Sequence, residues 1–437
     1  MSSITLFDLN KSLFERITSQ EHLREAFRTV KRNKGAAGID GISIDDFESN
    51  LDRELGQLQK ELCDWTYEPQ AVRRVEIPKS GGDGVRFLGV PCIRDRVVQT
   101  SIKEVLEPIF EPKFSEHSYG FRPGRSQKLA VEAAQKIVKS GKEYVVDIDL
   151  AKFFDRVQHD RLVYRLSQEI PDKRVLRLIG MTLRSGVMVN GLRMATDEGT
   201  TQGSPLSPLL SNVVLDELDK ELERRGLEFC RFADDCNIFV RTKKAAERVM
   251  VTVTKFIENR LRLVVNQEKS KVARSEFVKF LGMTIVAGAL AISVTSMGRA
   301  MAKVKELTPR GTSKSIEQTV ETINSWYVGW AGYYSMTEYP SQLAAIEAHV
   351  RRRLRSRIVS QQKRRRHLFA KLLQRGVKRG MAAKTAFSNM GRWATSNSFA
   401  LTKAYPNRWF IGELGLKVVS DQAKPHWFDV NTWIKLT

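Results

Sequence analysis

The stretch Arg231-Phe232-Ala233-Asp234-Asp235-Cys236 lies between two apolar, β-prone segments, residues 227–230 and 237–240. Its two acids fall where the chain would reverse, which predicts a β-hairpin with adjacent carboxylates at its tip. Adjacent aspartates repel each other, and a bound cation would neutralise them. Aspartate is also common in turns because its side chain hydrogen-bonds locally, so the dipeptide alone leaves a plain polar turn open.

The overall composition indicates a globular protein with a polyanionic partner. The 437 residues suffice for two or three domains, and 42% of them are hydrophobic. The net charge of +22 favours nucleic acid as the partner, with an anionic membrane second. No apolar run is long enough to span a bilayer, and the first 16 residues lack a signal-peptide core. The four cysteines show no Cys-x-x-Cys spacing, so we expect reduced thiols and no zinc site.

A second acidic element lies upstream, at residues 144–155, with the sequence Tyr-Val-Val-Asp-Ile-Asp-Leu-Ala-Lys-Phe-Phe-Asp. Alternation with period two places Val145, Asp147 and Asp149 on one strand face. Carboxylates on such an apolar strand are costly unless they bind a metal or bases. Of the two phenylalanines that follow, Phe153 is expected to pack in the core.

Residues 72–79 and 85–91 flank a glycine-rich turn and predict a second hairpin. Lys79 and Arg86 stand on either side of that turn and could reach one anion, although solvated edge charges would look the same. Residues 117–126 interleave aromatic and basic side chains, which suits a nucleic-acid template, and a rigid structural loop stays open as the alternative.

After about residue 297 the chain becomes helical and basic. Residues 325–334 form an aromatic segment that is most simply core packing between helices. Residues 351–380 hold thirteen lysines and arginines and no acid, which favours contact with a phosphate backbone over a mixed solvated surface.

Two acidic clusters are what a two-metal phosphoryl-transfer site requires. In such a site two Mg²⁺ ions lie about 4 Å apart; one activates the attacking 3′-hydroxyl and the other stabilises the leaving pyrophosphate. Lys79 and Arg86 would neutralise the charge of a triphosphate.

These motifs, in this order, resemble the group II intron-encoded reverse transcriptases (maturases), most of all the compact bacterial lineage without an endonuclease domain. The resemblance covers nearly the whole chain and rests on eight segments, at residues 33–41, 79–91, 118–126, 147–155, 202–208, 231–236, 261–271 and 280–282. It implies an α+β fold, a right-hand polymerase with an antiparallel palm sheet. The expected domains are fingers and palm (1–296), a helical maturase-specific thumb (297–380) and a small DNA-binding region (381–437).

The resemblance also implies roles for single residues. Asp149, rather than Asp147, matches the first metal-binding aspartate, and Asp234 and Asp235 complete the catalytic triad. The Leu150 carbonyl would help to hold a metal. Contacts to the incoming nucleotide or primer are implied for Lys79, Arg86, Phe154 (the gate against a ribose 2′-hydroxyl), Gln202 and Lys269.

The sequence departs from the family pattern at three positions. Phe232 replaces a tyrosine, which keeps the ring and loses a hydroxyl. Thr201 and Ser204 replace a proline and a glycine beside the nucleotide. No paired-cysteine endonuclease region follows, so DNA cleavage by this chain is not expected.

The implied cofactor is Mg²⁺, as two ions, with Mn²⁺ as a substitute. The implied partners are an RNA template, group II intron RNA, a DNA primer or target, and dNTPs, with no membrane; a homodimer stays open. The expected location is the bacterial cytoplasm, on the nucleoid when DNA is bound. A domesticated reverse transcriptase in defence or repair, and a maturase or RNA chaperone that only assists splicing, remain alternatives, although the intact acids argue against a lapsed polymerase.

Overall fold

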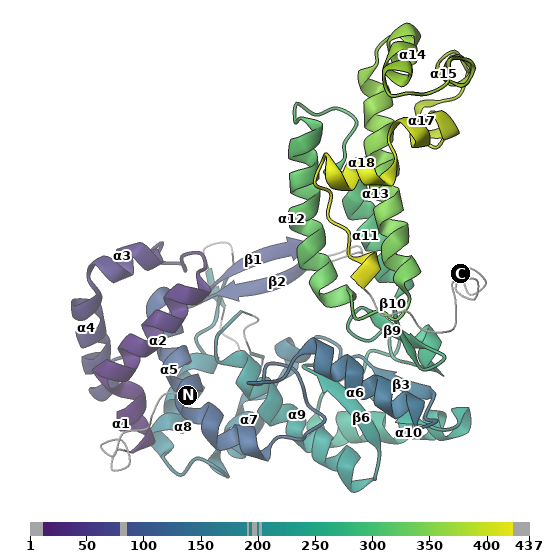
Figure 1. Cartoon of the computed structure of the whole chain (residues 1–437). Coiled ribbons are helices and arrows are strands. Elements are labelled where there is room, and N and C mark those ends of the chain that lie inside the picture. The colour runs from purple at the N-terminus through teal and green to yellow at the C-terminus, as the bar shows by residue number, and fades with distance from the viewer. Residues whose placement is uncertain (1–11, 79–84, 190–191, 195–198, 201–202, 423–437) are drawn as a thin grey trace. The chain divides into compact units, whose positions relative to one another are not determined.

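The computed structural model describes residues 12–78, 85–189, 192–194, 199–200 and 203–422. The chain divides into two compact units, Met1–Arg274 and Ser275–Thr437, which are described separately (Figure 1). The domain limits expected at 296/297 and 380/381 stay a prediction.

The first unit opens with a helical layer. It contains α1 (Leu13–Thr18), α2 (Gln20–Asn33), α3 (Ile44–Ser49), α4 (Leu51–Cys63) and α5 (Ile93–Phe110). The apolar spacing of residues 5–32 in the sequence runs through Ser19, but the helix is divided there, because the Ser19 hydroxyl accepts the His22 N–H and caps a new helix. The apolar spacing of residues 44–62 runs through Asn50, where the chain is divided into α3 and α4 without a side-chain cap.

A four-stranded sheet of order β2-β1-β4-β5 lies beyond this layer. Its strands are β1 (Val72–Pro78), β2 (Val85–Val90), β4 (Val187–Val189) and β5 (Leu192–Met194). Strands β1 and β2 pair antiparallel, with Ile77 opposite Arg86, so the expected hairpin is confirmed.

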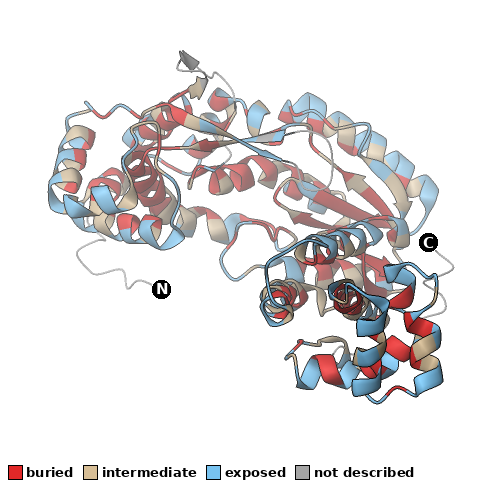
Figure 2. Cartoon of the chain, turned by 90° about the horizontal axis from the view of Figure 1, so that it is seen from above, coloured by how far each residue is buried: buried red, intermediate tan, exposed pale blue. Residues whose placement is uncertain are grey.

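The central sheet has the order β6-β7-β3-β8, and all its neighbours are antiparallel. Its strands are β3 (Tyr144–Ile148), β6 (Glu228–Phe232), β7 (Asp235–Val240) and β8 (Lys271–Arg274). Helices α6 (Gln127–Lys139), α9 (Ser207–Arg224) and α10 (Lys243–Phe256) pack against it. Val146 and Ile238 are fully buried in the core between these layers, and Figure 2 shows the buried residues along the strands and on the inner helix faces. Helices α7 (His159–Ser167) and α8 (Lys173–Leu183) complete the unit.

The second unit is a helical assembly with one small hairpin, β9 (Met283–Val286) and β10 (Ala289–Ile292). Its helices are α11 (Val294–Leu307), α12 (Ile316–Tyr334), α13 (Pro340–Gln361), α14 (Arg365–Gln374), α15 (Arg379–Ala386), α16 (Arg392–Thr395), α17 (Phe399–Ala404) and α18 (Asn407–Gly412). No helix among the described residues is both long and apolar enough to cross a bilayer.

The buried carboxylate of Glu347 connects α13 to α12 and to the segment at residues 419–420. It accepts hydrogen bonds from the Tyr327 hydroxyl (2.8 Å), the Val419 N–H (2.8 Å) and the Ser420 hydroxyl (2.7 Å). Tyr327 is buried among the helices, which confirms core packing for the aromatic segment of α12.

Candidate active site

The predicted acidic hairpin is formed by β6 and β7. Phe232 pairs with Asp235, so only Ala233 and Asp234 form the turn. Ala233 has a φ of +56°, a left-handed conformation that costs a residue with a side chain roughly 1–2 kcal/mol. The tip therefore needs support from its surroundings.

The strand register brings the second acidic element to the same place. Strand β3 pairs with β7, and the last pair in the ladder is Ile148 with Cys236. Asp149 directly follows Ile148, and Asp235 directly precedes Cys236. Asp149 and the tip of the hairpin therefore lie at the same end of the central sheet.

Asp149 is held by the loop that precedes β8. Its N–H donates to the Ser270 hydroxyl (3.0 Å), and its carbonyl accepts the Asn266 N–H (2.8 Å). The Lys269 ammonium lies 3.7 Å from the Asp149 carboxylate, so a residue expected near the primer stands beside the first aspartate. Leu150 is buried and forms an isolated bridge with Val265.

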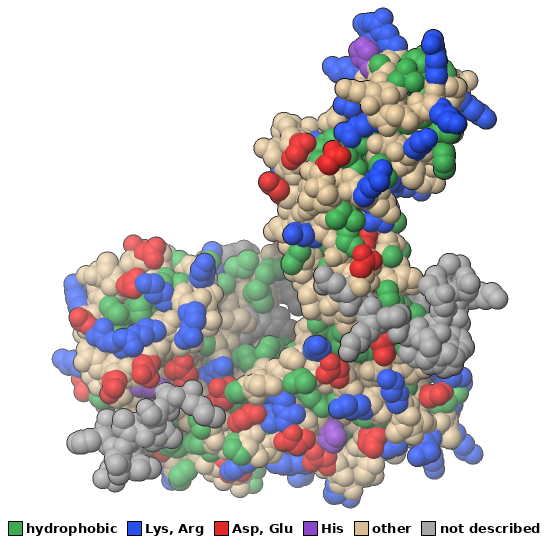
Figure 3. All heavy atoms as spheres, in the orientation of Figure 1, with side chains coloured by type: hydrophobic (Ala, Val, Ile, Leu, Met, Phe, Trp, Pro, Cys, Tyr) green, Lys and Arg blue, Asp and Glu red, His purple; other side chains and the backbone are tan. Residues whose placement is uncertain are grey.

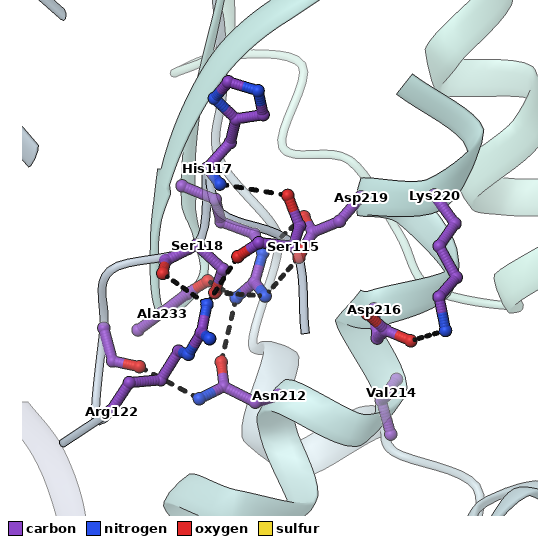
Figure 4. A network of polar contacts seen from close by, with 12 residues as sticks. Ser115, His117, Ser118, Arg122, Asn212, Val214, Asp216, Asp219, Lys220 and Ala233 are labelled. Atoms are coloured by element: carbon purple, nitrogen blue, oxygen red, sulfur yellow. Dashed lines mark hydrogen bonds and ion pairs between the residues drawn. The ribbon is translucent and has the colours of Figure 1, made fainter. Parts of the chain in front are cut away.

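The buried side chain of Arg231 forms hydrogen bonds that hold the hairpin tip. Arg231 donates from Nε to Oδ1 of Asp219 (2.7 Å) and from Nη2 to Oδ2 (2.6 Å), and both side chains are fully buried. Its Nη1 donates to the carbonyl of Ala233 (2.9 Å) and to the Asn212 amide oxygen (3.1 Å). Figure 4 shows this network around Asp219, Asn212 and Ala233. Burial alone would lower the pKa of Arg231, but the Asp219 carboxylate outweighs it and raises that pKa, so the pair stays charged.

The network continues into residues 117–120, whose backbone runs against the turn. Arg231 donates from Nη2 to the Ser118 hydroxyl (2.8 Å), and the Asn212 amide donates to the Gly120 carbonyl (2.9 Å). A Cβ atom on Gly120 would lie 2.2 Å from the backbone nitrogen of Ala233, closer than any side chain tolerates. Only glycine permits this approach.

Sequence reasoning missed this support, although two signals were present. Asp219 shares the spacing of Leu215, Leu218 and Leu222, so an acid occupies a core position of α9. Arg231 is likewise a cation inside an apolar strand. A charge at each of two core positions indicates a buried ion pair.

The residues expected around the nucleotide are only partly covered by the structure. Phe154 is half-buried, 5.2 Å from the ring of Phe153, which packs in the core as predicted. The Phe154 carbonyl accepts the Thr200 N–H (2.5 Å), so the segment before Gln202 runs beside the expected gate. Lys79 and Gln202 themselves lie outside the described residues, and Arg86 is placed by its pairing in β2.

The loop at residues 117–126 contains a buried structural arginine and an exposed aromatic ring, and the expected contact with a nucleic-acid template stays a prediction. Arg122 is buried, pairs with Glu111 (2.9 Å) and donates to the Ser118 carbonyl (2.9 Å), which is a structural role. Phe121 is 49% exposed, and its ring lies 6.4 Å from that of Phe232. The two rings line a hollow of about 370 Å³ beside the β6–β7 hairpin, together with Arg125.

The basic residues of the second unit also fall into two groups. Arg355 and Arg357 are buried, and they donate to the Tyr405 carbonyl (3.1 Å) and to the Thr319 hydroxyl, respectively. A second group is exposed, as Figure 3 shows for the end of the unit that carries α14 and α15; it comprises Lys363, Arg364, Arg365, Arg366, Lys378 and Arg379. The second group faces solvent and can reach a phosphate backbone.

The carboxylates at this end of the central sheet fit a metal ion that is bound partly by the protein and partly by the substrate. Among the described residues, no three Asp, Glu, His or Cys side chains are grouped closely enough to hold an ion by themselves. Mg²⁺ is commonly bound by one or two carboxylates together with water and substrate phosphates. The four cysteines are unpaired, and burial raises the pKa of the Cys230 thiol to about 12, so it is unreactive.

Comparison with known proteins assigns this geometry to a family. The family model described as reverse transcriptase (RNA-dependent DNA polymerase) matches residues 77–285, and that of the group II intron maturase-specific domain matches residues 297–376. Protein YkfC of Escherichia coli K12 is 33% identical over 315 residues, which cover 63% of this chain and 82% of YkfC. The chain belongs to the group II intron-encoded reverse transcriptases.

Other relatives share part of their length with this reverse transcriptase. The group II intron-encoded protein LtrA of Lactococcus lactis is 32% identical over 247 residues, 56% of this chain and 40% of LtrA. The retron Mx65 reverse transcriptase of Myxococcus xanthus is 32% identical over 209 residues, 45% of this chain and 47% of that protein. A partial Cas6-RT-Cas1–Cas2 complex is 25% identical over 57% of this chain and 43% of that one, but its TM-score of 0.38 is too low to support an argument.

The expected family, the α+β polymerase fold and the class of enzyme are thereby confirmed. The chain is an RNA-directed DNA polymerase with a maturase domain, and its partners include RNA. Reverse transcriptases use divalent metal ions.

Proposed function

We propose that this chain copies RNA into DNA by two-metal nucleotidyl transfer at the end of the central sheet. The proposal is supported above all by the register of β3 against β7. This register brings Asp149 next to the Asp234-Asp235 tip. Asp149, Asp234, Asp235 and the Leu150 carbonyl would hold two Mg²⁺ ions. When bound, such ions activate a 3′-hydroxyl and stabilise departing pyrophosphate.

The chain's own residues then bind and orient the substrates. Lys79 and Arg86 neutralise the triphosphate, and Gln202 contacts the incoming nucleotide. Phe154 excludes a 2′-hydroxyl by its bulk. The Lys269 ammonium, 3.7 Å from the Asp149 carboxylate, offsets its charge, and Lys269 also contacts the primer end.

We further propose that the protein binds a group II intron RNA, assists its splicing and supports retrohoming. The maturase-specific match at residues 297–376 and the exposed cations around α14 support this role. A net charge of +22 would make the binding strongly salt-dependent, because each phosphate contact releases a counterion.

Primer extension on an RNA template tests the proposal. Asp234→Ala and Asp235→Ala should abolish extension with Mg²⁺ or Mn²⁺ and leave RNA binding within about twofold, because the carboxylates act on metal rather than on RNA affinity. Asp45→Ala, at an exposed acid of α3, is the matched control. Extension retained in the two tip variants would contradict the metal assignment, and a splicing assay on the same proteins separates the maturase role.

A further inference from the structure

A cationic pocket lies in the second unit, and its residues are far in the sequence from the central sheet that carries the aspartates. The loop after α11, the C-terminal half of α13 and the start of α16 enclose a cavity of about 440 Å³. This volume lies within the range of pockets that bind small organic molecules. Four arginines and one tryptophan line it: Arg310, Arg353, Arg357, Arg392 and Trp393.

The lining of this pocket does not balance its positive charge, although the Glu317 carboxylate interacts electrostatically with Arg357 from outside the lining. No carboxylate lines it, and within the described part of the chain none of its four arginines forms an ion pair. Burial lowers the pKa of Arg353, and the neighbouring charge of Arg310 lowers it further, so the guanidiniums repel each other. A bound anion would relieve this repulsion.

Two of the arginines are fixed and two are exposed. Arg353 donates from Nε to the Thr308 hydroxyl (2.8 Å) and from Nη2 to the Thr308 carbonyl (2.6 Å). Arg357 donates to the Thr319 hydroxyl and to the Lys314 carbonyl. These bonds preorganise positive charge in the wall, while Arg310 and Arg392 stand exposed at the rim. Fixed donors bind an anion at a lower entropic cost than mobile ones.

The aromatic side chain supplies a second kind of contact. Trp393 keeps 38% of its surface exposed, although Arg352 stacks 4.0 Å from its ring centre. An indole ring next to guanidiniums is the combination that binds an unstacked base and its phosphate. An anionic protein segment would use the charge but not the ring.

We propose that this pocket binds one unpaired nucleotide of an RNA strand, with its phosphate among the four arginines and its base stacked on Trp393. The proposal rests on the RNA-binding role above and gives it a defined site in the second unit. A base inside a duplex is already stacked and cannot enter, so the pocket distinguishes single strands from helices.

The full-length protein is titrated with a 12-nucleotide oligouridylate, the matching oligodeoxythymidylate and an RNA duplex, each at several salt concentrations. Trp393→Ala should weaken oligouridylate binding at least about fivefold and leave the salt slope unchanged. Arg392→Ala should reduce the slope of log affinity against log salt by about 0.7, the value of one phosphate contact on a single strand. Trp393→Phe keeps an aromatic ring and should bind within about threefold of the unmodified chain, and Trp393→Leu replaces Trp393→Ala if the latter does not fold.

The controls are Phe399→Ala, an exposed aromatic of the same unit, and Arg408→Ala, an exposed arginine outside the pocket. Photocrosslinking of a 4-thiouridine oligonucleotide should label the peptide containing Trp393 in the unmodified chain. The pocket assignment would be overturned if wild type and pocket variants bound the oligonucleotide equally. It would also be overturned if the chain bound the duplex with equal affinity, or if polyglutamate competed equally strongly. Equal affinity for the deoxyoligonucleotide would show that the pocket binds either kind of single strand, and it would overturn the assignment to RNA. A wild-type chain that binds no RNA would instead refute the proposed function.

Discussion

Arg231 and Asp219 form a bidentate ion pair in which both side chains are fully buried, and the same guanidinium donates 2.9 Å to the Ala233 carbonyl. The pair therefore connects α9 to the turn that presents Asp234. Two charges taken out of water are costly unless their hydrogen bonds are complete. Here the Arg231 guanidinium donates five hydrogen bonds, two of them to Asp219. The arrangement fixes the tip of the hairpin rather than simply stabilising the core.

Arg231→Lys tests this positioning role. Lysine keeps the charge but loses the fork that reaches Asp219 and Ala233 together, so we expect a loss of about 2–3 kcal/mol in the free energy of unfolding. We also expect kcat for primer extension to fall more than tenfold, with a smaller change in KM for dNTP. Arg225→Lys, at a partly exposed pair with Glu221, should cost less than about 1 kcal/mol. A variant with normal kcat and reduced stability would reduce Arg231 to a structural role.

Gly120→Ala probes the same tip from the opposite side. The added methyl group would lie 2.2 Å from the Ala233 nitrogen, so the turn must shift, and we expect primer extension to fall at least tenfold. Gly56→Ala, in α4 with open space around its Cβ position, should be neutral or stabilising by about 0.5–1 kcal/mol. Single-turnover kinetics at saturating dNTP measure the effect on chemistry, and an unchanged rate would show that the turn tolerates displacement.

Lys269→Gln should change the metal requirement. The ammonium 3.7 Å from Asp149 competes with a cation for that carboxylate, so its removal should lower the Mg²⁺ concentration at half-maximal activity. Because the lysine is largely exposed, the shift should not exceed about fivefold. Lys255→Gln, at an exposed site on α10, is the control. A higher Mg²⁺ requirement in Lys269→Gln would mean that the lysine helps to assemble the site instead.

The two groups of arginines in the second unit should respond differently to substitution. Changing Lys363, Arg364 and Arg366 to glutamine should weaken RNA binding and reduce its salt slope, because the side chains of these exposed cations form no structural hydrogen bond within the described residues. Arg355→Ala should instead lower the melting temperature, because the Tyr405 carbonyl loses a buried donor. Thermal denaturation and salt titrations of both variants measure the difference. A destabilised triple variant with a normal salt slope would contradict the division.

Asp95 should make the protein more stable in mild acid. Burial raises the pKa of this carboxyl to about 6, although hydrogen bonds from Tyr67 (2.7 Å) and from the Gln70 N–H (3.1 Å) oppose the rise. The folded state then binds the proton more tightly than the unfolded chain, so this group lowers stability as pH rises from about 4 to 6. Its contribution is at most about 3 kcal/mol. Asp95→Asn should remove this fall, and urea denaturation at pH 4, 5, 6 and 7 measures it.

Local patterns predicted the elements that carry chemistry. The β-prone flanks of Asp234-Asp235, the period-two alternation before Asp149 and the glycine turn after Pro78 each indicated a strand or hairpin that the structure contains. Helix limits were less predictable. Ser19 and Asn50 divide helices that periodicity alone would continue, because a cap or kink changes the direction of the chain without interrupting its apolar spacing.

The sequence by itself determined which acids and cations this reverse transcriptase has, and in what order, because spacing and residue type are local properties. Tertiary structure alone decided which of them work together. The pairing of Arg231 with Asp219, the approach of Gly120 to Ala233 and the inward direction of Arg355 depend on elements that meet only after folding. The burial and partner of a charge are set by its neighbours in space, and these determine whether it binds a ligand or holds the fold.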